Sequence, residues 1–121
     1  MSIQQPPLRD ISAIHGYHAH IYYEPQTRAQ AERLRAAMEE LFPQARFGRW
    51  HDKPVGPHPS SMFQIAFAPD LFATLTPWLI LNKGDLTVFL HPETGADRTD
   101  HAERAVWMGR QQELDLSMLN D

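Results

Sequence analysis

The order of secondary-structure elements constrains the fold of this chain more than any single motif does. Apolar residues that alternate along the chain, such as Phe63, Ile65 and Phe67, are typical of strands that bury one face. On this pattern and on aromatic and β-branched content, four strands are predicted, over residues 17–23, 45–50, 62–68 and 86–91. Residues 51–61 hold three prolines and a glycine, so we expect a stiff loop there.

Two helices separate these strands. The first is predicted over 27–42, where apolar residues recur at helical spacing; Thr27 and Gln30 match a capping box, and Pro43 stops the helix. The second is predicted after Pro69, is broken or restarted at Pro77, and ends at 82–84. The other expected segments are an irregular arm over 1–15, a polar loop over 92–100, a short helix over 101–108 and a tail over 111–121.

The resulting order, βαββαβ, predicts a ferredoxin-like α+β fold, in which an antiparallel sheet carries both helices on one face. The 121 residues suit a single domain, and the C-terminal helix and tail could cover part of the other face. Because Tyr22 and Phe89 would add apolar surface to that open face, we also expect a homodimer.

Charge and composition exclude several classes of function. The net charge is −4 with both signs interspersed, so no basic patch indicates a nucleic-acid or membrane partner. No apolar stretch approaches the roughly 18–20 residues of a membrane-spanning helix, and the N-terminus has no signal-peptide pattern. Without cysteine there are no disulfides, thiolate metal sites or thiol nucleophiles. We therefore expect a cytoplasmic protein.

Seven histidines are the clearest chemical signal, because imidazole is the commonest metal ligand and the usual acid or base near neutral pH. Strand alternation puts His18 and His20 on the face opposite Ala19, and His91 on the face opposite Leu90. The first and fourth strands are neighbours in the predicted topology, which brings these three histidines together on the open face. Each one alone could equally be a solvated surface side chain.

Three segments of this chain resemble the DOPA 4,5-dioxygenase family. They read YHAHIYY, GRWHDKPVGPHP and TVFLHPETGADRTDHAERAVWMG, and they span about residues 17–110 in this order. The resemblance implies a ferredoxin-like fold and extradiol cleavage of a catechol ring by a non-haem iron(II) centre with O₂. The substrate could be DOPA or a related catechol.

The predicted metal ligands are His18, His20 and His91, with His58 as the rival for any of these places. An all-histidine set departs from the usual iron triad of two histidines and one carboxylate, so zinc or another divalent metal is an alternative to Fe(II). The nearest carboxylates lie on predicted loops or strand ends: Glu24, Asp52, Glu93, Asp97 and Asp100.

The remaining site residues are predicted by the needs of the chemistry. His58 or His101 is the expected acid or base, since an imidazole near its ordinary pKa works both ways at neutral pH. Tyr22 and Trp50 could flank an aromatic ring, and Arg49 or Arg98 could hold a substrate carboxylate.

Two other functions stay open on the sequence. One is a non-catalytic dimer on the same fold that binds a metal or ligand through its histidines. The other is a metal-free isomerase that uses histidine acid/base chemistry. Metal analysis separates the isomerase from the dioxygenase, and O₂ uptake with catechols separates the binding protein from it.

Overall fold

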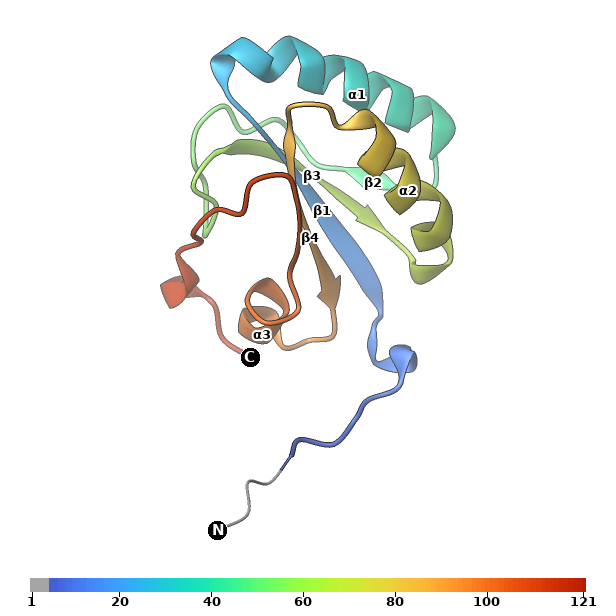
Figure 1. The fold of residues 1–121 in the computed structure, drawn as a ribbon, viewed down its shortest axis with the longest axis vertical. Helices are drawn as coiled ribbons and strands as arrows, with labels where there is room; N and C mark the ends of the chain where they lie inside the picture. Colours follow the sequence, from blue (N-terminus) through green and yellow to red (C-terminus); the bar gives the residue numbers. More distant parts are fainter. Residues whose placement is uncertain (1–4) are drawn as a thin grey trace.

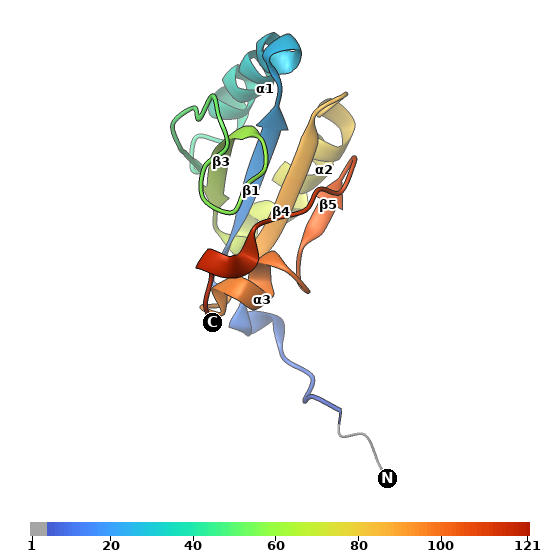
Figure 2. The same cartoon turned by 90° about the vertical axis from the view of Figure 1, so that its left-hand side faces the viewer.

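A five-stranded antiparallel sheet, with two helices packed on one face, forms the body of the computed structural model, which describes residues 5–121 (Figures 1 and 2). The spatial order of the strands is β2–β3–β1–β4–β5. The strands are β1 (Gly16–Tyr23), β2 (Arg46–Phe47), β3 (Ser61–Phe67), β4 (Thr87–Glu93) and β5 (Val106–Met108). This α+β sheet is compatible with the ferredoxin-like fold and confirms the predicted fold class.

Both sheet-covering helices form where helical periodicity predicted them. They are α1 (Arg28–Leu41) and α2 (Phe72–Asn82), preceded by the short 3₁₀ turns η2 (Pro25–Thr27) and η3 (Pro69–Leu71). The predicted capping box is wrong in its partners: it joins Glu24 to Thr27, while the Gln30 amide donates to the carbonyl of Lys83.

Pro77 does not break α2, contrary to prediction, although an internal proline removes one helical hydrogen bond. Leu75 and Leu79 on either side of it are both buried against the sheet, and this packing offsets the lost bond. No helix within residues 5–121 is long and apolar enough to cross a membrane.

The chain after β4 differs most from prediction. The helix expected over 101–108 is instead a shorter helix α3 (Asp97–His101), followed by the fifth strand β5. Val106, Trp107 and Met108 pair with β4, where Trp107 lies opposite Phe89. This tertiary pairing outweighs the local preference of the segment. The tail contains a 3₁₀ turn, η4 (Leu116–Met118). The predicted N-terminal arm contains another, η1 (Ile11–Ala13), and its residues 1–4 lie outside the described part of the chain.

The alternation predicted for the strands is confirmed, because the two sheet faces carry separate clusters. The helix-covered core includes Ala19, Ile21, Phe63, Ile65, Val88 and Leu90. On the opposite face, Tyr22, Met62 and Phe89 are buried against Trp107 and Leu114. The chain thus covers Tyr22 and Phe89 itself, with Trp107 of β5 and Leu114 of the tail, which removes the reason given above for a homodimer.

Candidate metal centre

The pairing of β1 with β4 brings three histidines together. His18 lies directly opposite His91, and His20 lies two pairs further on, opposite Phe89. The Nε2 atoms of His20 and His91 are 3.2 Å apart, and one donor nitrogen from each of the three histidines lies within 4.8 Å of the others. The predicted placement on one face is therefore correct, whereas the role of these residues as ligands stays a prediction.

These distances suit a shared metal ion. Two nitrogens bound at about 2.1 Å to one ion, at angles of about 90–110°, are themselves about 3.0–3.4 Å apart. The pair formed by His20 and His91 already has this spacing. His18 is the outermost of the three, with 26% of its side chain exposed, so it has room to turn toward the same point.

Burial keeps these imidazoles neutral, which is the state that binds metal. It lowers the pKa of His91 to about 3, with the charge of His101 acting in the same direction. The pKa of His20 lies well below its ordinary value, from burial first and then from the neighbouring histidines. Burial also lowers the pKa of His18, and the charges of His101 and Arg46 add to the effect.

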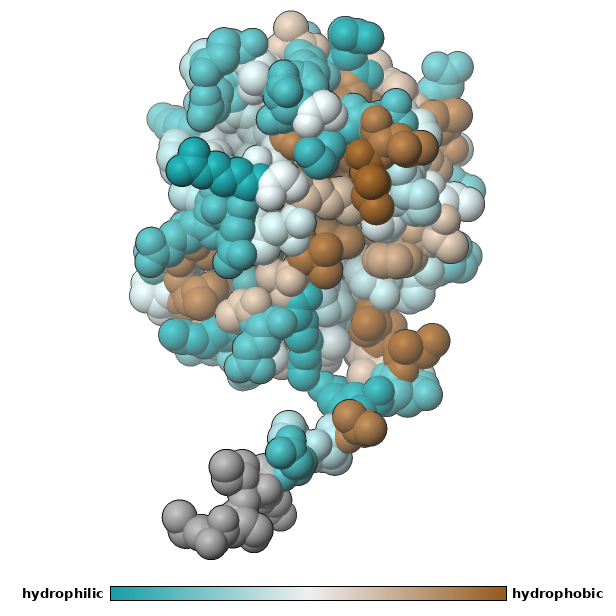
Figure 3. Space-filling view, viewed as in Figure 1, coloured by the Kyte–Doolittle hydropathy of each residue, from teal (hydrophilic) through white to brown (hydrophobic). Residues whose placement is uncertain are grey.

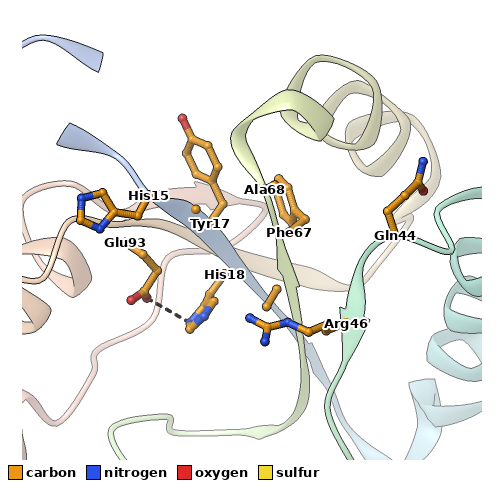
Figure 4. Close-up of a pocket in the computed structure, with 10 residues that line it drawn as sticks. His15, Tyr17, His18, Gln44, Arg46, Phe67, Ala68 and Glu93 are labelled. Carbon is orange, nitrogen blue, oxygen red and sulfur yellow. Dashed lines mark ion pairs between the residues drawn. The ribbon is translucent and has the colours of Figure 1, made fainter. Parts of the chain in front are cut away.

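Hydrogen bonds to the other ring nitrogen orient two of the three imidazoles. Nδ1–H of His91 donates to the carbonyl of Pro92 at 3.0 Å, and Nδ1 of His18 lies 3.0 Å from the carboxylate of Glu93 (Figure 4). Both arrangements leave Nε2 for a ligand, as is usual for metal-binding histidines. Nδ1 of His20 is buried without a hydrogen-bond partner in the described chain, and its Nε2 lies 3.2 Å from Nε2 of His91, where the two nitrogens either share a proton or could hold one ion.

Negative charge lies close to this cluster. Burial raises the pKa of Glu93, and the charges of Asp97 and Asp100 raise it further. Three carboxylates thus lie near one another at the end of β4 and in α3. Their field favours a cation beside the neutral histidines.

His58 and His101 complete a group of five imidazoles. His58, on the loop between β2 and β3, packs 4.2 Å from the ring of His20, and its Nδ1 lies 2.8 Å from the hydroxyl of Tyr22. His101, in α3, packs 3.9 Å from the ring of His91, and its Nδ1–H donates to the carbonyl of Asp97. Burial lowers the pKa of His58 to about 4, so the expectation of an ordinary imidazole fails there.

Tyr22 and Trp50, which were predicted to flank the aromatic ring of a substrate, do not line an open site at the histidine centre. Tyr22 is 2% exposed and holds His58 instead of facing solvent. Trp50 packs on Tyr23 and Phe63, on the helix-covered side of the sheet. The prediction for Trp50 was wrong, and the edge segment that pairs with β3 explains why.

The cause is an extra residue opposite β3. The backbone N–H of Gly48 donates to the carbonyl of Gln64, and the backbone N–H of His51 donates to the carbonyl of Met62. Three residue steps along the edge segment therefore match two along β3. A bulge of this kind reverses which face the following side chains reach, and Trp50 turns to the core.

Arg49 and Arg98 are both exposed, and neither forms an ion pair within residues 5–121. The structure therefore assigns them no special position at the centre.

Sequence reasoning gave no role to two carboxylates that support the site. Glu93 orients His18, as described above. Asp100 is fully buried in α3, where it accepts hydrogen bonds from the backbone N–H of Thr94 at 2.8 Å and from the guanidinium of Arg104 at 3.0 Å. It thereby fixes the segment that carries His101. In the sequence both resemble ordinary loop acids, and only their contacts in the folded chain distinguish them.

A cavity of about 460 Å³ opens beside the exposed edge of His18 (Figure 4). Its lining includes His18, Glu93, Ala66, Arg46 and Gln44. The cluster of five imidazoles thus has a polar entrance at His18, large enough for a small aromatic molecule.

The comparisons with known proteins agree with this architecture. The model of the Dopa 4,5-dioxygenase family matches residues 17–118, so the chain belongs to that family. A crystal structure of a candidate dioxygenase from Nostoc punctiforme is 41% identical and superposes with a TM-score of 0.88, covering 90% of this chain and 94% of the other.

Two fungal relatives are longer than this chain. An uncharacterised 21.2 kDa protein of Botryotinia fuckeliana is 38% identical over 89% of this chain and 66% of its own length. A DOPA 4,5-dioxygenase of Amanita muscaria is 29% identical over 89% of this chain and 51% of its own length. The chain thus spans about half to two thirds of these relatives.

Proposed function

We propose that this protein is a dioxygenase that cleaves a catechol ring in the extradiol manner with Fe(II) and O₂. Extradiol cleavage breaks the ring carbon–carbon bond beside the two hydroxyl-bearing carbons and adds both oxygen atoms of O₂ to the product. The observation that carries the proposal is the cluster of His18, His20 and His91, in a chain that belongs to the Dopa 4,5-dioxygenase family.

The three histidines would hold the ion from one side. An iron(II) ion bound there would supply coordination positions for a catechol and O₂ and would relay electrons from the catechol, which is the net reductant of O₂. Glu93 and the carbonyl of Pro92 hold His18 and His91 so that each Nε2 faces the centre. Because His20 and His91 are buried and His18 borders the cavity, substrate would approach from the His18 side.

His58 and His101 would serve the proton transfers. A catechol must lose protons to chelate a metal, and ring opening returns one. His58 is neutral at neutral pH and its Nδ1 lies beside the hydroxyl of Tyr22; its pKa of about 4 means that it would hold a proton only briefly and return it readily to the product. His101 uses Nδ1–H on the carbonyl of Asp97, which leaves its Nε2 for exchange with the substrate.

The test begins with metal content. His20→Ala should abolish most metal binding while circular dichroism stays unchanged, and His15→Ala, at an exposed histidine before β1, should bind metal normally. Full metal occupancy in the His20 variant would refute the assignment of the centre.

Activity is then measured as O₂ uptake after anaerobic loading. Fe(II) should support uptake with DOPA, caffeate or protocatechuate, and zinc should not, because zinc has no accessible redox change. His58→Ala should keep the metal and slow uptake by roughly 10²–10⁴-fold. An iron-loaded protein that consumes no O₂ with any of these catechols would contradict the proposal.

We further propose that the protein acts as a homodimer. Since the chain itself covers Tyr22 and Phe89, the interface would use apolar surface elsewhere. Figure 3 shows such surface over α2, where Ile80 and Leu81 are 57% and 82% exposed. Light scattering should report about twice the 13.9 kDa mass of one chain, and Leu81→Asp should yield the single-chain mass.

A further inference from the structure

Four paired strands place an arginine in line with the histidine centre. Arg46 of β2 lies opposite Ala66 of β3, Ala66 lies opposite His18 of β1, and His18 lies opposite His91 of β4. Residues directly opposite one another in neighbouring strands point to the same face. Arg46 therefore shares the face of the histidines, and its backbone is two strand spacings, about 10 Å, from that of His18.

The space between Arg46 and His18 is open. Ala66 lies between them, and its short side chain leaves the floor of the 460 Å³ cavity unfilled. Figure 4 shows the guanidinium of Arg46 turned back across β3 toward His18, with Glu93 on the far side of that imidazole. Within residues 5–121, no carboxylate lies at ion-pair distance from Arg46. Arg46 differs from the unpaired Arg49 and Arg98 because it lines the cavity beside His18.

We propose that Arg46 binds a carboxylate carried by the substrate, and so selects catechols with an acidic side chain. The inference rests on the proposed function for the catechol itself and adds the group that fixes its orientation. With the ring hydroxyls toward His18, a side chain of two or three carbons would extend over Ala66 to the guanidinium. A guanidinium binds a carboxylate through two parallel hydrogen bonds, which gives orientation as well as affinity.

Binding is measured first on zinc-loaded protein, which does not consume the catechol. The probes are 3,4-dihydroxyphenylpropionate, neutral 4-methylcatechol, and 3-phenylpropionate, which has the carboxylate but no hydroxyls. Arg46→Gln should weaken calorimetric binding of both acids by about 10- to 100-fold and leave 4-methylcatechol and metal content unchanged. Arg46→Lys should be intermediate, and Arg33→Gln, the matched control at an exposed arginine of α1, should match the wild type.

The outcomes separate this inference from the proposed function. Unchanged affinity of Arg46→Gln for the acids, equal weakening of acidic and neutral catechols, or failure of the wild type to bind either acid would each overturn the role of Arg46. If iron-loaded wild type consumes no O₂ with any catechol but binds 3-phenylpropionate through Arg46, the dioxygenase proposal fails and the carboxylate site stands. If turnover occurs, Arg46→Gln should raise KM for the acidic catechol and leave kcat nearly unchanged.

Discussion

Acid should destabilise the metal-free protein strongly, because its folded state holds imidazoles that must remain neutral. Burial lowers the pKa of His58 to about 4 and that of His91 to about 3, whereas both are near 6.5 in an unfolded chain. Between these values the unfolded chain binds more protons than the folded one. The contribution of these neutral histidines to the free energy of unfolding is therefore fully present above about pH 6.5, and it is lost as the pH falls toward their folded-state pKa values.

The size of the loss follows from these shifts. At pH 5 each of the two histidines favours the unfolded chain by about 2 kcal/mol relative to pH 7.5. Together they remove about 4 kcal/mol, and His20 acts in the same direction. A domain of this size has only about 5–15 kcal/mol to lose, so the midpoint of unfolding should shift visibly.

Urea unfolding of the metal-free protein at several pH values between 7.5 and 5 measures this loss. His58→Gln, which can still hydrogen-bond the hydroxyl of Tyr22, should lose about 2 kcal/mol less than the wild type over the same interval. His15→Gln, at an exposed histidine, should follow the wild type. A wild-type stability that does not change across this range, or a His58 variant with the full loss, would refute the burial argument.

Two further changes test the surroundings of the centre. Glu93→Gln should lower metal affinity by about 10- to 100-fold without changing the fold, because it weakens the support of His18; metal titration checks this, and unchanged affinity would argue against that support. Asp100→Ala should lower the free energy of unfolding by about 2–4 kcal/mol, because it leaves the N–H of Thr94 and the guanidinium of Arg104 without their partner; denaturant unfolding should show it, and a loss under about 1 kcal/mol would contradict it.

Much of the centre could be predicted from local periodicity. The side chains of a strand alternate between two faces, so the apolar residues Ala19 and Leu90 were enough to assign His18 and His91 to the opposite face. The order of helices and strands then made β1 and β4 neighbours. The structure confirms both steps, because alternation is local and the βαββαβ order puts the first and fourth strands side by side.

Features set by a single extra residue or by partner choice could not be predicted in this way. The bulge between Gly48 and His51 turns Trp50 to the core, and nothing in the alternation marks it. The segment 106–108 becomes a strand because β4 offers an unpaired edge, and the same pairing covers Phe89 with Trp107. The expectation that Phe89 would add exposed apolar surface was wrong because Trp107 covers it.

In β1, β3 and β4 the sequence by itself determined which residues face which side of the sheet, because that property is local and repeats every two residues. The tertiary structure alone decided distances, burial and partners. It set the 3.2 Å between His20 and His91, the packing of His101 on His91 through the anchor of Asp100, and the position of Arg46 across Ala66 from His18. These depend on how sequence-distant segments pair and pack, and the chemistry proposed for the protein depends on them.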